Sequence, residues 1–158
     1  MKVFITGATG FVGGFILREL KKQGYEVRCL VRNKEQAKRN GINETEMVVG
    51  DVTDLDSLQG LVSGSDAIIH LVAIIKEDRK RGITFEDINF EATNNIVNAA
   101  VEQGVNRFLH ISALGADPQG LTPYFRTKGR AEALVKASSL NYSIFRPSFI
   151  YGPGDAVY

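Results

Sequence analysis

The chain contains few of the residues that mark disulfide-rich proteins or metalloproteins. Its 158 residues include one cysteine, two histidines and no tryptophan. Cys29 cannot form a disulfide within the chain, and it has no second cysteine with which to share a metal ion. His70 and His110 each stand in an apolar run with no carboxylate at ligand spacing. We therefore expect no metal site, and we expect both histidines in the core or behind a site.

An excess of charge of one sign is also absent. Lysine and arginine total 19 against 18 for aspartate and glutamate, which gives a formal net charge of +1. Nucleic acids and anionic membranes attract a strongly basic surface, so a small-molecule partner is expected instead. The N-terminus does not resemble a signal peptide, and no apolar run reaches the roughly 18 residues of a membrane span. These features predict a cytoplasmic protein without a membrane-spanning segment.

Short runs rich in β-branched residues alternate with longer helical patterns. Their nearly continuous apolar character is typical of strands that are covered on both faces, and helical crossovers between them imply a parallel sheet. The sequence predicts one doubly wound α/β domain over residues 1–158, with strand order 3-2-1-4-5-6. Strands are expected at 3–6, 27–31, 47–49, 67–72, 107–111 and 142–150, and helices at 10–22, 33–39, 54–61, 84–102 and 122–137.

A glycine-rich loop follows the first expected strand. The stretch ITGATGFVGG places Gly7, Gly10 and Gly13 between that strand and the first helix. Glycines there permit a tight turn, let a pyrophosphate approach the backbone, and allow the helix to pack closely on the strand. The helix N-terminus adds amide donors for a phosphate. The spacing indicates dinucleotide binding, and the alternative is a turn that serves packing only.

The end of the second expected strand bears on the choice of cofactor. Folds that prefer NAD often carry an acidic residue there, whereas this chain has Arg32 followed by Asn33. A guanidinium suits the 2′-phosphate of NADP, so NADP(H) is favoured over NAD(H). The alternative is a surface arginine paired with Glu35.

A tyrosine and a lysine stand four residues apart in YFRTK. Thr122 and Pro123 precede Tyr124 in the pattern of a helix start, so Tyr124 and Lys128 would share one helix face. A neighbouring ammonium favours the phenolate form of tyrosine, as acid–base catalysis requires. Ser112, just after the fifth strand, could hold a carbonyl or alcohol against the phenol. This combination suits hydride transfer coupled to proton transfer, and the alternative is an amphipathic surface helix.

Taken together, these motifs resemble the short-chain dehydrogenase/reductases over essentially all of the chain, in particular the extended and atypical branches. The resemblance rests on TGATGFVG, GDVTD, HLVA, DINFEATNNIVNAA, Ser112, the Tyr124 and Lys128 pair, and FRPSFIYGPG. The latter half of the chain is most similar to the branch that contains the NAD(P)H-binding accessory subunit of respiratory complex I and its bacterial relatives.

The resemblance implies roles for individual residues. The catalytic positions fall on Ser112, Tyr124 and Lys128, with Asn89 ordering a proton-relay water or, alternatively, facing solvent. Cofactor contacts fall on Gly7, Thr9, Gly10, Phe11, Val12, Gly13, Arg32, Asp51, Val52, Leu71, Val72, Ala73, Lys128, Pro147 and Ser148. Leu71, Val72 and Ala73 replace a more polar segment of the family.

Two functions remain open at this point. The first is an NADP(H)-dependent oxidoreductase acting on a small carbonyl, an alcohol or a nucleotide-sugar-type substrate. The second is a non-catalytic NAD(P)H-binding module used in assembly or redox sensing, as the resemblance to the complex I subunit implies. The resemblance is also compatible with a homodimer or with association with a respiratory complex. Extended members build the substrate pocket after the sixth strand, so we expect that segment outside these 158 residues.

Overall fold

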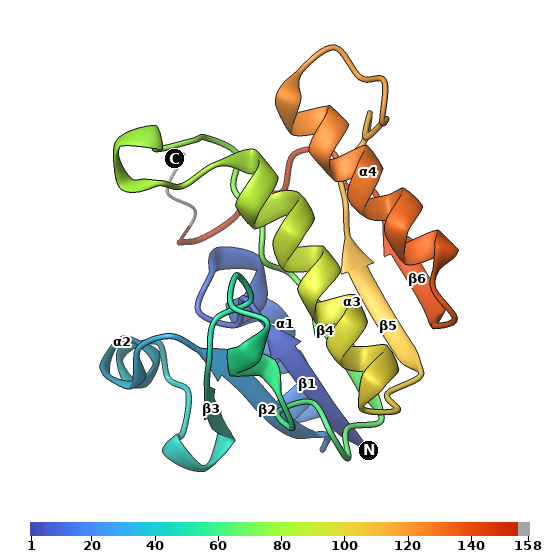
Figure 1. The fold of residues 1–158 in the computed structure, drawn as a ribbon. Helices are drawn as coiled ribbons and strands as arrows, with labels where there is room; N and C mark the ends of the chain where they lie inside the picture. Colours follow the sequence, from blue (N-terminus) through green and yellow to red (C-terminus); the bar gives the residue numbers. More distant parts are fainter. Residues whose placement is uncertain (155–158) are drawn as a thin grey trace.

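The computed structural model describes residues 1–154 and contains one six-stranded sheet (Figure 1). All strand pairs are parallel, and the order is β3-β2-β1-β4-β5-β6. The strands are β1 (Lys2–Thr6), β2 (Glu26–Val31), β3 (Met47–Val49), β4 (Ala67–His70), β5 (Arg107–Ile111) and β6 (Asn141–Phe145). The predicted fold class and strand order are confirmed.

Helices connect the strands and lie on both faces of the sheet (Figure 1). They are α1 (Phe11–Lys22), α2 (Lys34–Arg39), α3 (Ala92–Glu102) and α4 (Pro123–Ala137), with shorter turns η1 (Glu44–Glu46), η2 (Asp56–Leu58), η3 (Arg79–Arg81) and the π-helical η4 (Glu86–Glu91). The start of α4 follows the sequence signal, because the Thr122 hydroxyl accepts a hydrogen bond from the Phe125 amide at 3.2 Å. Pro123 then occupies the first helical position.

Four expected elements differ from the structure. The helix expected at 84–102 begins as the π-helical η4, and it is α-helical only from Ala92. The helix expected at 54–61 is only the single turn η2, which is followed by Gly60 with a φ of 70°. The expected fourth strand ends two residues early, at His70. The expected sixth strand ends at Phe145 rather than at residue 150. Proline at position 147 has no N–H to continue the ladder, and it also restricts the residue before it.

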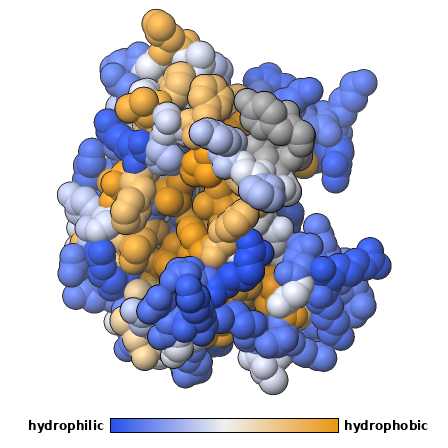
Figure 2. All heavy atoms as spheres, turned by 180° about the vertical axis from the view of Figure 1, so that it is seen from behind, coloured by the Kyte–Doolittle hydropathy of each residue, from blue (hydrophilic) through white to orange (hydrophobic). Residues whose placement is uncertain are grey.

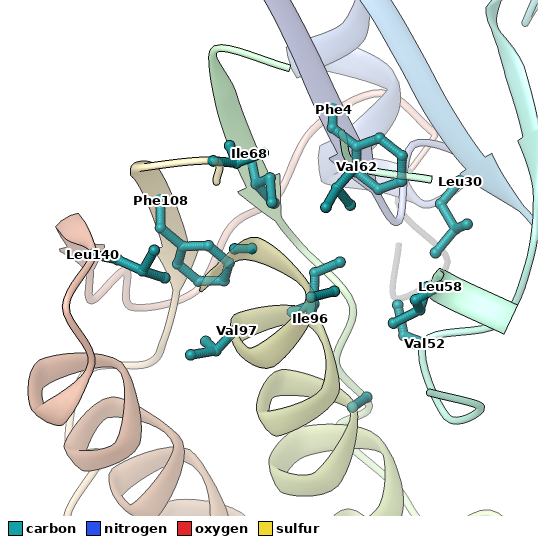
Figure 3. Close-up of a cluster of buried hydrophobic side chains, with 14 of the residues drawn as sticks. Phe4, Leu30, Val52, Leu58, Val62, Ile68, Ile96, Val97, Phe108 and Leu140 are labelled. Carbon is teal, nitrogen blue, oxygen red and sulfur yellow. The ribbon is translucent and has the colours of Figure 1, made fainter. Parts of the chain in front are cut away.

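The main core lies between the sheet and helices α3 and α4 (Figure 3). Phe4, Ile68 and Phe108 stand at neighbouring register positions on β1, β4 and β5, and each is fully buried. Ile96 of α3 packs against this row. The row continues toward the carboxyl ends of the strands with Thr6, His70 and His110, so the same face carries polar groups as it nears the site.

The opposite face of the sheet is covered unevenly. Next to β1 and β2, residues of α1 and α2 complete a second buried cluster. Along β5, however, Phe108 and His110 are buried while Leu109 and Ile111 are only partly so, and Phe145 of β6 is 50% exposed. No helix within residues 1–154 packs on this side of β5 and β6. Figure 2 shows a broad apolar region on the rear of the molecule, whereas parallel sheets normally have both faces covered.

The two histidines form a stacked pair in the core. Their ring centroids are 5.7 Å apart at an interplanar angle of 12°. His70 shares hydrogen bonds with the hydroxyls of Thr6 at 2.7 Å and Thr93 at 3.2 Å. Neither ring nitrogen of His110 has a hydrogen-bond partner among the described residues. Burial lowers the pKa of His70 to about 3 and holds the pKa of His110 well below 6.5.

This pair predicts a loss of stability in mild acid. Both imidazoles are neutral in the folded chain, while in the unfolded chain they gain protons below their ordinary pKa of 6.5, so stability falls as pH decreases through that value. Replacing His110 with Phe keeps an aromatic ring in place and removes one titrating group. Between pH 7.5 and pH 5.5, the variant should lose about 1.4 kcal/mol less unfolding free energy than the unmodified protein. Urea unfolding at both pH values measures this difference, and equal losses would contradict the prediction.

Candidate functional site

A cleft of about 290 Å³ opens at the carboxyl ends of β1, β2 and β4. In a doubly wound sheet, this edge is where ligands bind. The glycine loop and the segments after β2, β3 and β4 supply its walls, which include Thr6, Gly7, Thr9, Gly10, Val31, Arg32, Asn33, Gly50, Asp51, Val52, Leu71, Val72 and Ala73. A larger hollow of about 580 Å³ lies between α3 and α4 and contains none of the candidate residues.

The glycine loop is shaped for close approach of a ligand to the backbone. Gly7 has a φ of 76°, and a Cβ there would lie 3.2 Å from the carbonyl carbon of Leu71 and from the amide nitrogen of Val72. Gly10 is the N-cap of α1, and it makes no side-chain cap hydrogen bond. The amide groups of the first turn therefore remain available to an anion, with the helix dipole behind them. These features fit the pyrophosphate of a dinucleotide.

Gly13 has a different role from the two glycines before it. It is buried in α1, and a Cβ built on it would lie 2.0 Å from the carbonyl oxygen of Gly7. The helix can therefore approach the turn only because this position has no side chain. Phe11, Val12 and Gly13 are not among the residues that line the cleft, so any contact they make with a ligand would come from their backbone amides at the start of α1.

Arg32 and Asp51 line the part of the cleft next to the ends of β2 and β3. Arg32 is exposed and forms no ion pair with any residue in 1–154, because Glu35 pairs instead with Lys38 at 3.6 Å. The surface-pair alternative for Arg32 is therefore not what the structure contains. The Asp51 carboxylate accepts hydrogen bonds from the amide and hydroxyl of Thr53 at 2.9 and 2.8 Å, which fixes its orientation on the wall.

Ser112 directly follows β5, and Tyr124 and Lys128 lie in the first half of α4; none of the three lines the cleft. Lys128 is only 1% exposed, and its ammonium donates a hydrogen bond to the carbonyl oxygen of Ile111 at 2.6 Å. The Ser112 hydroxyl is buried with no partner of ordinary hydrogen-bond geometry. Tyr124 is half-buried, with ring contacts to Phe85 at 5.7 Å and Phe125 at 5.4 Å between centroids. Within the described residues, no hydrogen bond joins the three candidates to one another.

The pKa values of Lys128 and Tyr124 are both shifted, and the shift of Tyr124 is opposite to the one expected from the sequence. Burial lowers the pKa of Lys128 to about 8, although the negative charge of Glu132 acts in the opposite direction. Burial raises the pKa of the Tyr124 phenol, whereas the sequence suggested that the lysine would lower it. The reason is geometric, because the ammonium is directed to Ile111 and not to the phenol. In the protein alone, Tyr124 is therefore a protonated phenol at neutral pH.

Asn89 holds the backbone of Ile74, a residue of the cleft wall, through two hydrogen bonds. It is fully buried in η4, where its side-chain oxygen accepts a hydrogen bond from the Ile74 amide at 2.8 Å and its side-chain nitrogen donates to the Ile74 carbonyl at 3.1 Å. Both polar atoms of the amide are thus engaged, and the solvent-facing alternative does not apply. Pro147 and Ser148 lie beyond β6 outside the cleft lining, where the Pro147 carbonyl accepts a hydrogen bond from the Leu114 amide at 2.8 Å.

Sequence reasoning missed one buried group beside Lys128. Glu132 is 1% exposed and binds Arg146 through two hydrogen bonds. Its spacing of four residues from Lys128 on a helix would have placed it on the same face. Among the described residues, no cluster of three or more histidine, cysteine, aspartate or glutamate side chains could hold a metal ion.

Comparison with known proteins adds to this geometry. The sequence pattern of a family described as NAD(P)H-binding matches residues 7–156. The chain belongs to this NAD(P)H-binding family. The resemblance to the extended branch of the short-chain dehydrogenase/reductases is thereby confirmed, and so is a nicotinamide dinucleotide as the type of cofactor. None of the helices in residues 1–154 has the length and apolar character needed to cross a membrane.

The proteins that are similar to this chain have names that describe different functions. The chain is 35% identical to a ceramide reductase of Caulobacter vibrioides over 97% of this chain and 47% of that protein. It is 30% identical to the 40 kDa subunit of Neurospora crassa mitochondrial NADH-ubiquinone oxidoreductase, over 94% of this chain and 40% of the subunit. The solved structure of MoeE5 with UDP-glucuronic acid and NAD matches 98% of this chain and 56% of its own, with a TM-score of 0.79 and 27% identity. The chain spans less than half the length of these two curated relatives.

The contact of α1 with the glycine loop gives a prediction about stability. Gly13→Ala would force the helix away from the Gly7 carbonyl, and we expect it to lower the unfolding free energy by about 2 kcal/mol or more. The neighbouring Gly14 is a matched control, since the nearest atom to a Cβ there is the flexible Arg18 guanidinium at 3.7 Å. Gly14→Ala should be neutral or stabilising by up to about 1 kcal/mol. Thermal unfolding distinguishes the two, and equal effects would refute the close-packing role of Gly13.

Proposed function

We propose that the chain is the nucleotide-binding part of an NADPH-dependent oxidoreductase. The observation that carries this proposal is the position of Arg32, exposed on the cleft wall and without an ion pair in the described part of the chain. An acidic residue there would accept hydrogen bonds from an unmodified ribose, whereas a guanidinium suits a 2′-phosphate.

Each part of the site then has one task. When bound, NADPH supplies a hydride to the substrate. The amide groups at the start of α1 hold the pyrophosphate, and Arg32 binds the 2′-phosphate. Lys128 would hold the nicotinamide ribose through its ammonium, which has two further donors beside the one that reaches the Ile111 carbonyl. Ser112 donates a hydrogen bond to the substrate carbonyl oxygen, and Tyr124, which is protonated at neutral pH, gives its proton to that oxygen as it becomes an alcohol.

A second candidate is a binding module that uses NAD(P)H without turnover. One observation favours it: in residues 1–154, Tyr124, Ser112 and Lys128 share no hydrogen bond, and the Lys128 ammonium donates to the Ile111 carbonyl and to neither of the other two. Similarity to a respiratory-complex subunit agrees with this candidate. The presence of all three catalytic residue types makes the oxidoreductase our first proposal.

The substrate side of the site is proposed to lie beyond these residues. The partly uncovered face of β5 and β6 and the exposed Phe149 would be covered by a further segment of a longer polypeptide, which would also complete the substrate pocket. The substrate class that we propose is a small carbonyl, an alcohol or a nucleotide sugar, and the last agrees with the ligand named for MoeE5. A cytoplasmic location, a homodimer and association with a respiratory complex remain predictions.

The cofactor proposal predicts that NADPH binds more tightly than NADH. Replacing Arg32 with Ala should weaken NADPH binding roughly tenfold or more, because a charged hydrogen bond contributes about 1.5–3 kcal/mol, and should leave NADH binding unchanged. Arg28→Ala is a control on β2, the strand that Arg32 directly follows, since the Arg28 guanidinium reaches Ser63 and does not line the cleft. Fluorescence titration with both nucleotides measures the affinities. Equal or tighter NADH binding by the unmodified protein would refute the proposal.

The catalytic proposal is tested at Tyr124 in the full-length protein. Tyr124→Phe should leave NADPH affinity within about twofold and reduce turnover by about 10²–10⁴-fold, because the phenol moves a proton and holds no phosphate. Tyr142→Phe, at a half-exposed tyrosine on β6, should leave both quantities unchanged. Assays that follow NADPH oxidation with a panel of carbonyl substrates provide the measurement. Unchanged turnover in the Tyr124 variant would favour the binding module.

A further inference from the structure

The helix α4 presents a regular column of polar residues toward the sheet. Tyr124, Lys128 and Glu132 follow one another at intervals of four, so they lie on one face over two turns. Their burial increases along the column, from the half-buried phenol to the lysine and glutamate, which are each 1% exposed. Carboxylates are almost never fully buried unless they are paired, so the presence of Glu132 needs an explanation.

Arg146 supplies the partner for this carboxylate. Its Nε donates to Glu132 Oε1 at 2.8 Å, and its Nη2 donates to Oε2, which forms a two-point contact. Lys136 adds a weaker contact at 3.3 Å. Burial alone would raise the pKa of Glu132, but the hydrogen bonds from Arg146 and Lys136, with the nearby Ser112 hydroxyl, outweigh it and lower the pKa, so Glu132 is a carboxylate at neutral pH.

The pair also joins the segments that carry the candidate catalytic groups. Arg146 directly follows β6, and the Phe145 carbonyl accepts a hydrogen bond from the Ser112 amide at 2.7 Å. The Pro147 carbonyl binds the Leu114 amide in the same way, at 2.8 Å. The contact from Glu132 to Arg146 therefore ties α4 to the strand end on which Ser112 is held. The Ser112 hydroxyl itself is buried close enough to the carboxylate to help lower its pKa.

Among the titratable groups around Lys128, Glu132 is the one whose negative charge stabilises the Lys128 ammonium. His110 on β5 and His70 on β4 face Lys128 and are neutral, because burial lowers the pKa of each. On α4, the Tyr124 phenol is also neutral. Glu132 raises the pKa of Lys128 against the larger effect of burial. Arg146 and Lys136 contact Glu132 and partly offset its charge.

We propose that Glu132, held by Arg146, is a positioning residue that keeps the Lys128 amine charged and fixes the Ser112 end of β5 against α4. The role in reaction rests on the proposed function, in which a charged Lys128 binds the nicotinamide ribose. The electrostatic coupling between Glu132 and Lys128 is a property of the chain itself, so it can be measured without nucleotide.

The experiment follows the titration of Lys128 by NMR of protein labelled with ¹³C at lysine Cε, with the resonance assigned by its loss in Lys128→Met. In Glu132→Gln, we expect the titration midpoint to fall by about one pH unit, because the opposing negative charge is removed. In Arg146→Gln, we expect the midpoint to rise, since Glu132 then acts on Lys128 without its competitor. Glu86→Gln is the matched control, because Glu86 pairs with Arg130 of α4 at 2.8 Å in an exposed position; it should leave the midpoint unchanged.

The Lys128 midpoint is expected to shift in opposite directions in the two variants, and this difference separates an electrostatic role of Glu132 from a merely structural one. A midpoint that stays or rises in Glu132→Gln would overturn the proposal. If that variant does not fold, Arg146→Gln decides, and a midpoint that stays or falls there would overturn it. In a parallel titration, NADPH affinity should decline with rising pH at the Lys128 midpoint and shift with it in each variant, and a decline that does not follow that midpoint would also overturn the proposal. Failure of the unmodified protein to bind NADPH would instead overturn the proposed function, while a shifted Lys128 midpoint would still support the coupling.

Discussion

The site depends on one close contact between backbones, that of α1 with the turn after β1. Gly13 allows the helix to rest on the Gly7 carbonyl, and Gly7 in turn adopts a positive φ beside the backbone of residues 71 and 72. This contact directs the free amide groups at the start of α1 across the carboxyl ends of the strands. Arg32, Asp51 and the segment after β4 can form walls of one cleft because this floor is fixed.

The parts of the structure that repeat a general rule were predictable from sequence. Apolar strand runs, helix starts such as Thr122 and Pro123, and the glycine spacing each depend on local chemistry, and the sheet order follows from the fold class. Elements whose length depends on tertiary contacts could not be predicted from the sequence. The segment at 54–61 has helix-forming residues, yet Ser57 bonds back to the carbonyl of Asp51, and the segment forms only a single turn. The sixth strand seemed longer because the stretch after Phe145 is apolar, and its apolar residues remain exposed.

The candidate site shows the same division. Residue types and their order along the chain pointed to segments that follow strands, and such segments line the cleft. The direction of the Lys128 ammonium and the involvement of both amide atoms of Asn89 depend on which backbone groups happen to lie nearby. Glu132 was overlooked because a glutamate in a helix is normally read as a solvent-facing residue, and only the fold brings Arg146 to it.

The uneven covering of the sheet has a consequence for the way the domain opens. Strands β1 and β2 are packed on both faces, whereas among the described residues β5 has buried residues on one face only and β6 has no buried residue. Local opening free energy follows the number of buried contacts that must be broken. Amide hydrogens of β6 should therefore exchange with solvent sooner than those of β1, and the domain should behave as a rigid nucleotide-binding half joined to a looser half. That looser half carries Ser112 and Arg146, so whatever covers its open face would also slow the motion of the groups beside the reacting centre.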